Sequence, residues 1–211
     1  MWIPNYRRHR LADAAKAYAA AGWPVAPGAW WDPSEKRYRC APTGCLTEGL
    51  HPTLPDLRGT TRRCQVIVEQ AATRDVGTVD RRWGRRPHSV LLPTGQVCDA
   101  IELGPTAARR VQAVLAAQGS LGPVATFPDE TVLLFTGVAE PGTDLADELH
   151  AACALHHGRG SWVPLPPSQL ATGPMRWTRS PGAARWRLPS LRRVVETLRV
   201  ALASASPAEG T

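Results

Sequence analysis

The chain has 211 residues, of which 43% are hydrophobic and 20% are charged, so it has the length of one domain or two small ones. This balance provides a core of ordinary size and excludes a disordered chain. No segment approaches the roughly 20 consecutive apolar residues of a membrane helix, and the N-terminal region lacks the apolar stretch of a signal peptide. We therefore expect a cytoplasmic protein that does not insert into membranes.

Basic residues outnumber acidic residues by 25 to 18, which gives a formal net charge of +7. An excess of this size favours a polyanionic partner such as nucleic acid or the phosphates of a nucleotide. Nearly all of the basic residues are arginine, which is also typical of GC-rich coding sequences. Charge alone therefore leaves a second interpretation open, a protein-interaction module whose positive charge has no function.

The first half of the chain predicts helices, a short strand and a long loop. Apolar residues at steps of three and four predict three helices, over 10–21, 65–71 and 75–85. A short strand is expected over 23–27. Residues 28–63 are rich in Pro and Gly and have no sustained periodicity. Because loops of this length rarely stay without structure in a compact domain, we expect something to hold this one in place.

The second half of the chain predicts a sheet with helices beside it. Expected strands cover 89–93, 97–103, 124–127, 131–135 and 161–165, and expected helices cover 105–118, 144–155 and 191–202. The short connections Thr94-Gly95-Gln96 and 128–130 predict two hairpins. Strands in hairpins beside helices favour the α+β class, with a mixed or antiparallel sheet in a single domain over 1–203 and a frayed tail over 204–211.

The loop over about 28–64 carries candidate zinc ligands. Cys40, Cys45 and His51 lie within a dozen residues, and two thiolates with an imidazole suit a tetrahedral Zn²⁺, which would give the loop its order. A structural site takes four ligands, and Cys64 is the nearest thiol that completes the set. Five cysteines without an export signal disfavour a disulfide framework. The alternative is that these thiols and the imidazole are incidental.

Two carboxylates lie on or beside the expected strand after Gly95. Asp99 and Glu102 near one strand end suit Mg²⁺ or Mn²⁺, which prefer oxygen ligands and assist phosphoryl transfer. Side chains alternate along a strand, so positions 99 and 102 share a face only where a bulge or a strand end intervenes. The alternative is an exposed Asp and Glu at the end of a strand.

The run over 158–168 predicts a phosphate-binding turn. Its Gly-Arg-Gly start allows close approach of the backbone to a phosphate, and its double proline makes a rigid turn that presents a serine. A purely structural turn is the competing interpretation. The residues expected to contact phosphates are Arg159, Ser168, Arg176 and His157, the last of which otherwise suits a helix cap.

Taken in order, these segments resemble the bifunctional DNA primase/polymerase N-terminal family of the archaeo-eukaryotic primase superfamily, in its short actinobacterial form. The resemblance spans about residues 10–190. It is carried by Gly22-Trp23-Pro24-Val25-Ala26-Pro27, the cysteine loop that ends in His51-Pro52, Leu92-Pro93-Thr94-Gly95, the strand from Asp99 to Leu103, and Pro166-Pro167-Ser168.

The resemblance implies a palm-like sheet of the RNA-recognition-motif type, a zinc-bearing loop and template-directed nucleotidyl transfer with divalent metal. It makes Asp99 the first metal ligand, while Glu102 departs from the family, which usually spaces the pair with one residue between. The strand over 131–135 lacks the histidine that contacts the nucleotide in relatives. The stretch before Gly158 lacks the third acidic residue and reads Leu155-His156-His157.

Two functions follow from these observations. The first is a primase/polymerase-like protein that binds nucleotides and DNA and transfers nucleotides with Mg²⁺ or Mn²⁺. The second is a catalytically inactive protein of the same fold that binds DNA or has a regulatory role.

Overall fold

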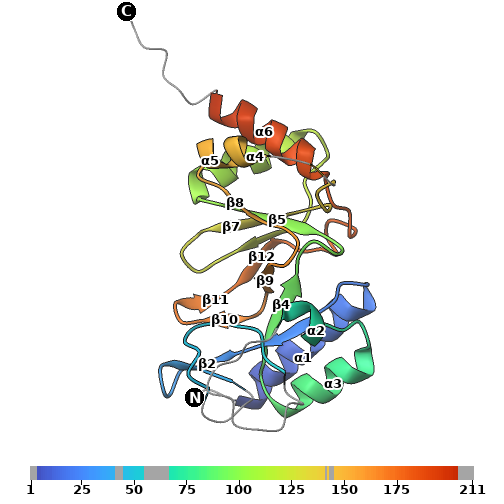
Figure 1. Ribbon diagram of the computed structural model, residues 1–211, viewed down its shortest axis with the longest axis vertical. Coiled ribbons are helices and arrows are strands. Elements are labelled where there is room, and N and C mark those ends of the chain that lie inside the picture. The colour runs from blue at the N-terminus through green and yellow to red at the C-terminus, as the bar shows by residue number, and fades with distance from the viewer. Residues whose placement is uncertain (1–3, 41–44, 55–66, 141, 143–144, 204–211) are drawn as a thin grey trace, which may run out of the picture. The chain divides into compact units, whose positions relative to one another are not determined.

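The computed structural model describes residues 4–40, 45–54, 67–140, 142 and 145–203 (Figure 1). Helices combine with antiparallel sheets, which confirms the α+β class. The chain divides into two compact units, one formed by residues 1–94 and 159–176 and the other by 95–158 and 177–211. The single domain over 1–203 stays a prediction, and the tail over 204–211 lies outside the described residues. No described helix has the length and apolar character to cross a bilayer.

The first unit is built on a small sheet in which β4 (Ser89–Pro93) lies between β1 (Ala26–Gly28) and β9 (Trp162–Leu165), with antiparallel pairing on both sides. Two hairpins accompany it, β2 with β3 (Trp30–Asp32 and Arg37–Arg39) and β10 with β11 (Gln169–Leu170 and Gly173–Pro174). Its helices are α1 (Pro4–Ala20), α2 (Val68–Ala71) and α3 (Val76–Arg85).

Helix α3 shows why the local sequence patterns predict helices well. The Asp75 carboxylate caps its start by accepting a hydrogen bond from the Thr78 amide at 2.7 Å. Val79 and Trp83, four residues apart, share one face and are fully buried. Trp83 Nε1 donates to the His88 carbonyl at 2.8 Å, which satisfies the indole inside the core.

The second unit is built on a five-stranded sheet with the order β12-β6-β7-β5-β8. The strands are β5 (Asp99–Leu103), β6 (Val124–Thr126), β7 (Val132–Thr136), β8 (Leu155–His157) and β12 (Arg176–Arg179). The helices α4 (Pro105–Ala117), α5 (Ala146–Ala151) and α6 (Leu191–Ala203) lie on one side of this sheet (Figure 1). Ile101 and Leu103 of β5 pack with α4 and α6 in one buried apolar cluster.

The predicted hairpin between 89–93 and 97–103 is wrong, although both strands form. Strand β4 pairs with β1 and β9, and β5 pairs with β7 and β8. Both edges of each strand are therefore taken by strands distant in the sequence. Gly95, at φ +80°, forms the expected turn, and its amide donates to the Cys98 carbonyl at 3.0 Å. The predicted hairpin of β6 and β7 is confirmed.

The predicted helix over 144–155 is too long at its C-terminal end. Helix α5 ends at Ala151, and Cys153 has a left-handed backbone at φ +48° that breaks the helical path. The next residues form β8, which pairs with β5. This change of element brings two histidines next to the strand that carries Asp99 and Glu102.

Two glycine substitutions are expected to change the stability of the protein in opposite directions. A Cβ on Gly122 would lie 2.5 Å from Pro189 Cδ and 3.1 Å from the Phe135 carbonyl oxygen. We expect Gly122→Ala to destabilise the protein by about 1–3 kcal/mol through overpacking. Gly84 lies in α3 with no atom near its added Cβ, so Gly84→Ala should stabilise by up to about 1 kcal/mol. Denaturant titration followed by circular dichroism measures both changes, and shifts of the same sign would contradict this account.

Candidate functional site

The two carboxylates of β5 lie on opposite faces of the sheet. Strand β5 pairs with β7 in an unbroken register of five residues, from Asp99 opposite Thr136 to Leu103 opposite Val132, so no bulge resets the alternation. Asp99 therefore shares the face of Ile101 and Leu103, which packs against the helices, while Glu102 belongs to the other face. The structure does not bring this predicted pair together, and the two side chains do not fit one shared Mg²⁺ or Mn²⁺.

Asp99 is held inside the protein by hydrogen bonds. Its side chain is 1% exposed, and its Oδ2 atom accepts from the Ala139 amide and from His156 Nε2, both at 2.9 Å. Its Oδ1 atom is buried and has no hydrogen-bond partner among the described residues. Burial, aided by the Asp99 charge, raises the pKa of the neighbouring Cys98 thiol to about 12. This thiol is therefore protonated at neutral pH and is no nucleophile.

Glu102 has its own histidine on the opposite face. His157 Nε2 donates to Glu102 Oε2 at 3.0 Å, and the Glu102 side chain is partly exposed. Strand register explains both pairs, because His156 lies opposite Ile101 and His157 lies opposite Ala100. The predicted phosphate contact of His157 stays untested, and its ring nitrogen is engaged with a carboxylate here. The sequence interpretation missed these pairs because it assigned both histidines to the end of a helix.

The other predicted phosphate contacts have different surroundings. Ser168 is fully buried, accepts from the Val90 amide at 2.9 Å and donates to the Val90 carbonyl at 3.3 Å. These two bonds join the turn after β9 to β4, which gives the hydroxyl a structural role. Arg159 and Arg176 are exposed, in the turn before β9 and at the start of β12.

Three of the four predicted zinc ligands lie together in the first unit. The ligand atoms of Cys40, Cys45 and His51 are all within 4.8 Å of one another, and no other described group of three such residues is as close. Two backbone hydrogen bonds fix this end of the loop beside β1, from Ala29 N to His51 O and from Thr53 N to Pro27 O, each at 2.9 Å. Cys64 lies outside the described residues.

The His51 ring is oriented as a metal ligand would be. Its Nδ1 atom donates to the Gly49 carbonyl at 3.0 Å, which leaves the lone pair of Nε2 directed toward Cys45 Sγ at 3.8 Å. Burial lowers the pKa of His51, against a smaller opposite effect of the Gly49 carbonyl, so the ring is neutral at neutral pH. A neutral imidazole beside two thiols is a donor set that fits Zn²⁺.

Comparison with known proteins identifies the family. No curated protein matches the chain. The family model of the bifunctional DNA primase/polymerase, N-terminal, matches residues 15–194, which is most of the chain and includes both the β5 carboxylates and the Cys/His cluster. The resemblance seen in the sequence is thereby confirmed, and the chain belongs to the bifunctional DNA primase/polymerase N-terminal family.

Proposed function

We propose that this primase/polymerase-like protein binds DNA and does not perform metal-dependent nucleotidyl transfer with Asp99 and Glu102. The observation that carries this proposal is the register of β5, which assigns the two carboxylates to opposite faces of the sheet. Metal-assisted phosphoryl transfer needs oxygen ligands that converge on the same ions. In two-metal sites the two ions lie about 4 Å apart. Side chains on opposite faces of one regular strand do not converge in this way.

The surroundings of the carboxylates support the same proposal. Asp99 is buried, and one of its oxygens already accepts two hydrogen bonds, while Glu102 is engaged with His157. All five residues of β7 are buried and none is a histidine, so this strand offers no imidazole to an incoming nucleotide. Charged groups that converge on the transferring phosphate raise the rate of transfer by orders of magnitude. In this arrangement the two carboxylates do not converge, and β7 adds no histidine.

Binding to DNA makes weaker geometric demands than catalysis does. The net charge of +7 attracts a polyanion without any requirement for convergent carboxylates. Membership of a primase/polymerase family makes DNA and nucleotides the natural polyanions. A binding role therefore agrees with both the charge and the arrangement of the β5 carboxylates.

We further propose that Cys40, Cys45 and His51 hold a structural Zn²⁺, with Cys64 as the predicted fourth ligand. The converging thiols and the oriented imidazole support this proposal. The ion would order the loop and would take no part in chemistry, because a site closed by four protein ligands leaves no position for a substrate.

The proposed function is tested by primer extension and DNA binding measured side by side. We expect wild-type protein to form no product with Mg²⁺ or Mn²⁺, and to bind labelled DNA at low salt equally well whether or not Mg²⁺ or Mn²⁺ is added. Binding should weaken steeply with added salt because counterions are released. Fluorescence anisotropy gives the affinity. Metal-dependent product that disappears in Asp99→Asn, an isosteric change, would overturn the proposal.

The zinc proposal is tested by metal analysis of purified variants. We expect about one zinc ion per wild-type chain, and much less in Cys40→Ser and in His51→Ala. Cys153→Ser is the matched control, because Cys153 is an exposed free thiol outside the cluster, and it should retain the metal. Retention of zinc in His51→Ala, or its loss from the Cys153 variant, would count against this site.

A further inference from the structure

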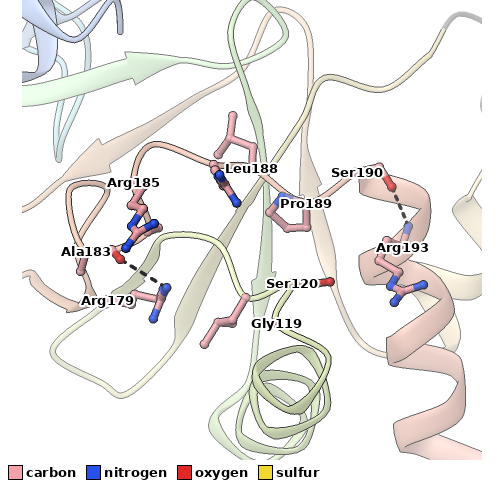
Figure 2. Close-up of a pocket in the computed structure, with 12 residues that line it drawn as sticks. Gly119, Ser120, Arg179, Ala183, Arg185, Leu188, Pro189, Ser190 and Arg193 are labelled. Carbon is pink, nitrogen blue, oxygen red and sulfur yellow. Dashed lines mark hydrogen bonds between the residues drawn. The ribbon is translucent and has the colours of Figure 1, made fainter.

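A pocket of about 640 Å³ lies in the unit formed by 95–158 and 177–211 (Figure 2). The turn after α4, the end of β12, the segment after β12 and the first turn of α6 form its walls. Its volume falls within the range of small-molecule sites, about 300–1,000 Å³. The pocket shares no residue with the Asp99 and Glu102 pairs or with the Cys/His cluster.

The lining of this pocket is strongly basic. No acidic residue contributes to it, whereas four arginines do: Arg179, Arg185, Arg187 and Arg193. None of the ion pairs found among the described residues includes one of these four guanidinium groups. Four like charges around one concave surface repel one another, and a bound anion would relieve that repulsion.

The Arg179 guanidinium group is held in place by a hydrogen bond to the backbone. Its Nη2 atom donates to the Ala183 carbonyl at 3.3 Å, and the Ala183 amide in turn donates to Ser180 Oγ at 3.1 Å. Its Nε atom is buried and has no hydrogen-bond partner within the described part of the chain. The hydrogen bond to Ala183 therefore orders the Arg179 guanidinium group where it lines the pocket.

Helix α6 adds a second source of positive potential. Ser190 caps its start, where Ser190 Oγ accepts from the Arg193 amide at 3.2 Å, and both residues line the pocket. The helix has 13 residues and no acidic residue in its first turn, so the positive end of its dipole is not neutralised there. Figure 2 shows Arg193 on this first turn, and Arg179 with Arg185 on another part of the rim.

We propose that this pocket binds neighbouring phosphate groups, either of a DNA strand or of a free nucleoside triphosphate. Guanidinium groups pair with phosphate oxygens through two parallel hydrogen bonds, and helix N-termini favour the same oxyanions. The pocket is larger than a single phosphate requires, which favours a ligand with several phosphates. The DNA source rests on the function proposed above, whereas the phosphate chemistry of the pocket does not.

The test compares two double variants with equal loss of charge. Arg179→Gln with Arg193→Gln removes two pocket arginines. Arg109→Gln with Arg110→Gln is the matched control, because these residues are exposed on α4 in the same unit and do not line the pocket. Each protein is titrated with inorganic tripolyphosphate by calorimetry and with labelled single-stranded DNA by anisotropy. Circular dichroism establishes that all of them fold, and Arg193→Gln alone serves if the half-buried Arg179 is needed for stability.

We expect the pocket variant to bind at least about tenfold more weakly than wild type, and the control to change by less than about threefold. If the pocket variant binds both ligands more weakly, the pocket is assigned to phosphate chains in general. If it binds only tripolyphosphate more weakly, the pocket is assigned to free nucleotides. Equal weakening in the two double variants would overturn the proposal, as would a wild-type protein that binds neither ligand. If the wild-type protein does not bind tripolyphosphate and the pocket variant binds DNA as well as wild type does, the pocket proposal is overturned and the proposed function stands.

Discussion

The alternation of side chains along β5 is the constraint on which the site depends. Because successive residues of a regular strand point to opposite faces, a separation of three residues places Asp99 and Glu102 on different sides of the sheet. A separation of two would place them on one side. The same alternation on β8 sends His156 to Asp99 and His157 to Glu102, so each face holds one carboxylate and one imidazole. Two separate pairs thus replace the single cluster that a shared metal ion requires.

Asp99 and its hydrogen bond to His156 lie on the face of the sheet that packs against the helices, and Asp99 is buried there. The neighbouring positions on that face, Ile101 and Leu103, belong to the apolar core beneath the helices, where an unpaired carboxylate would carry a large desolvation cost. Hydrogen bonds from the Ala139 amide and from His156 offset this cost at Oδ2. They also tie the segment after β7 and the edge strand β8 to the centre of the sheet.

Local patterns in the sequence predicted most of the elements but not all of their partners. Helices over 75–85, 105–118 and 191–202 and the hairpin of β6 and β7 follow from periodicity and turn residues, which act over a few positions. The strands that pair with β4 and with β5 lie dozens of residues away in the sequence. The residues around Gly95 therefore predicted the turn correctly, but the hairpin expected across it does not form. The two histidine pairs escaped prediction for the same reason, because they require the position of β8.

The proximity of Cys40, Cys45 and His51 was predictable, since ligands within a dozen residues meet whenever the loop turns back on itself. The arginine pocket was not, because its residues come from the turn after α4, from β12 and the segment after it, and from α6, and no motif in the sequence joins them. Phosphate binding and nucleotidyl transfer differ in the geometric precision that they require. Phosphate binding tolerates flexible arginine side chains and depends mainly on charge, whereas nucleotidyl transfer needs carboxylates that converge on the same ions. In the function proposed above, the separation of three residues between Asp99 and Glu102 removes the geometry for catalysis on a shared metal ion, and the positive charge still serves to bind a polyanion.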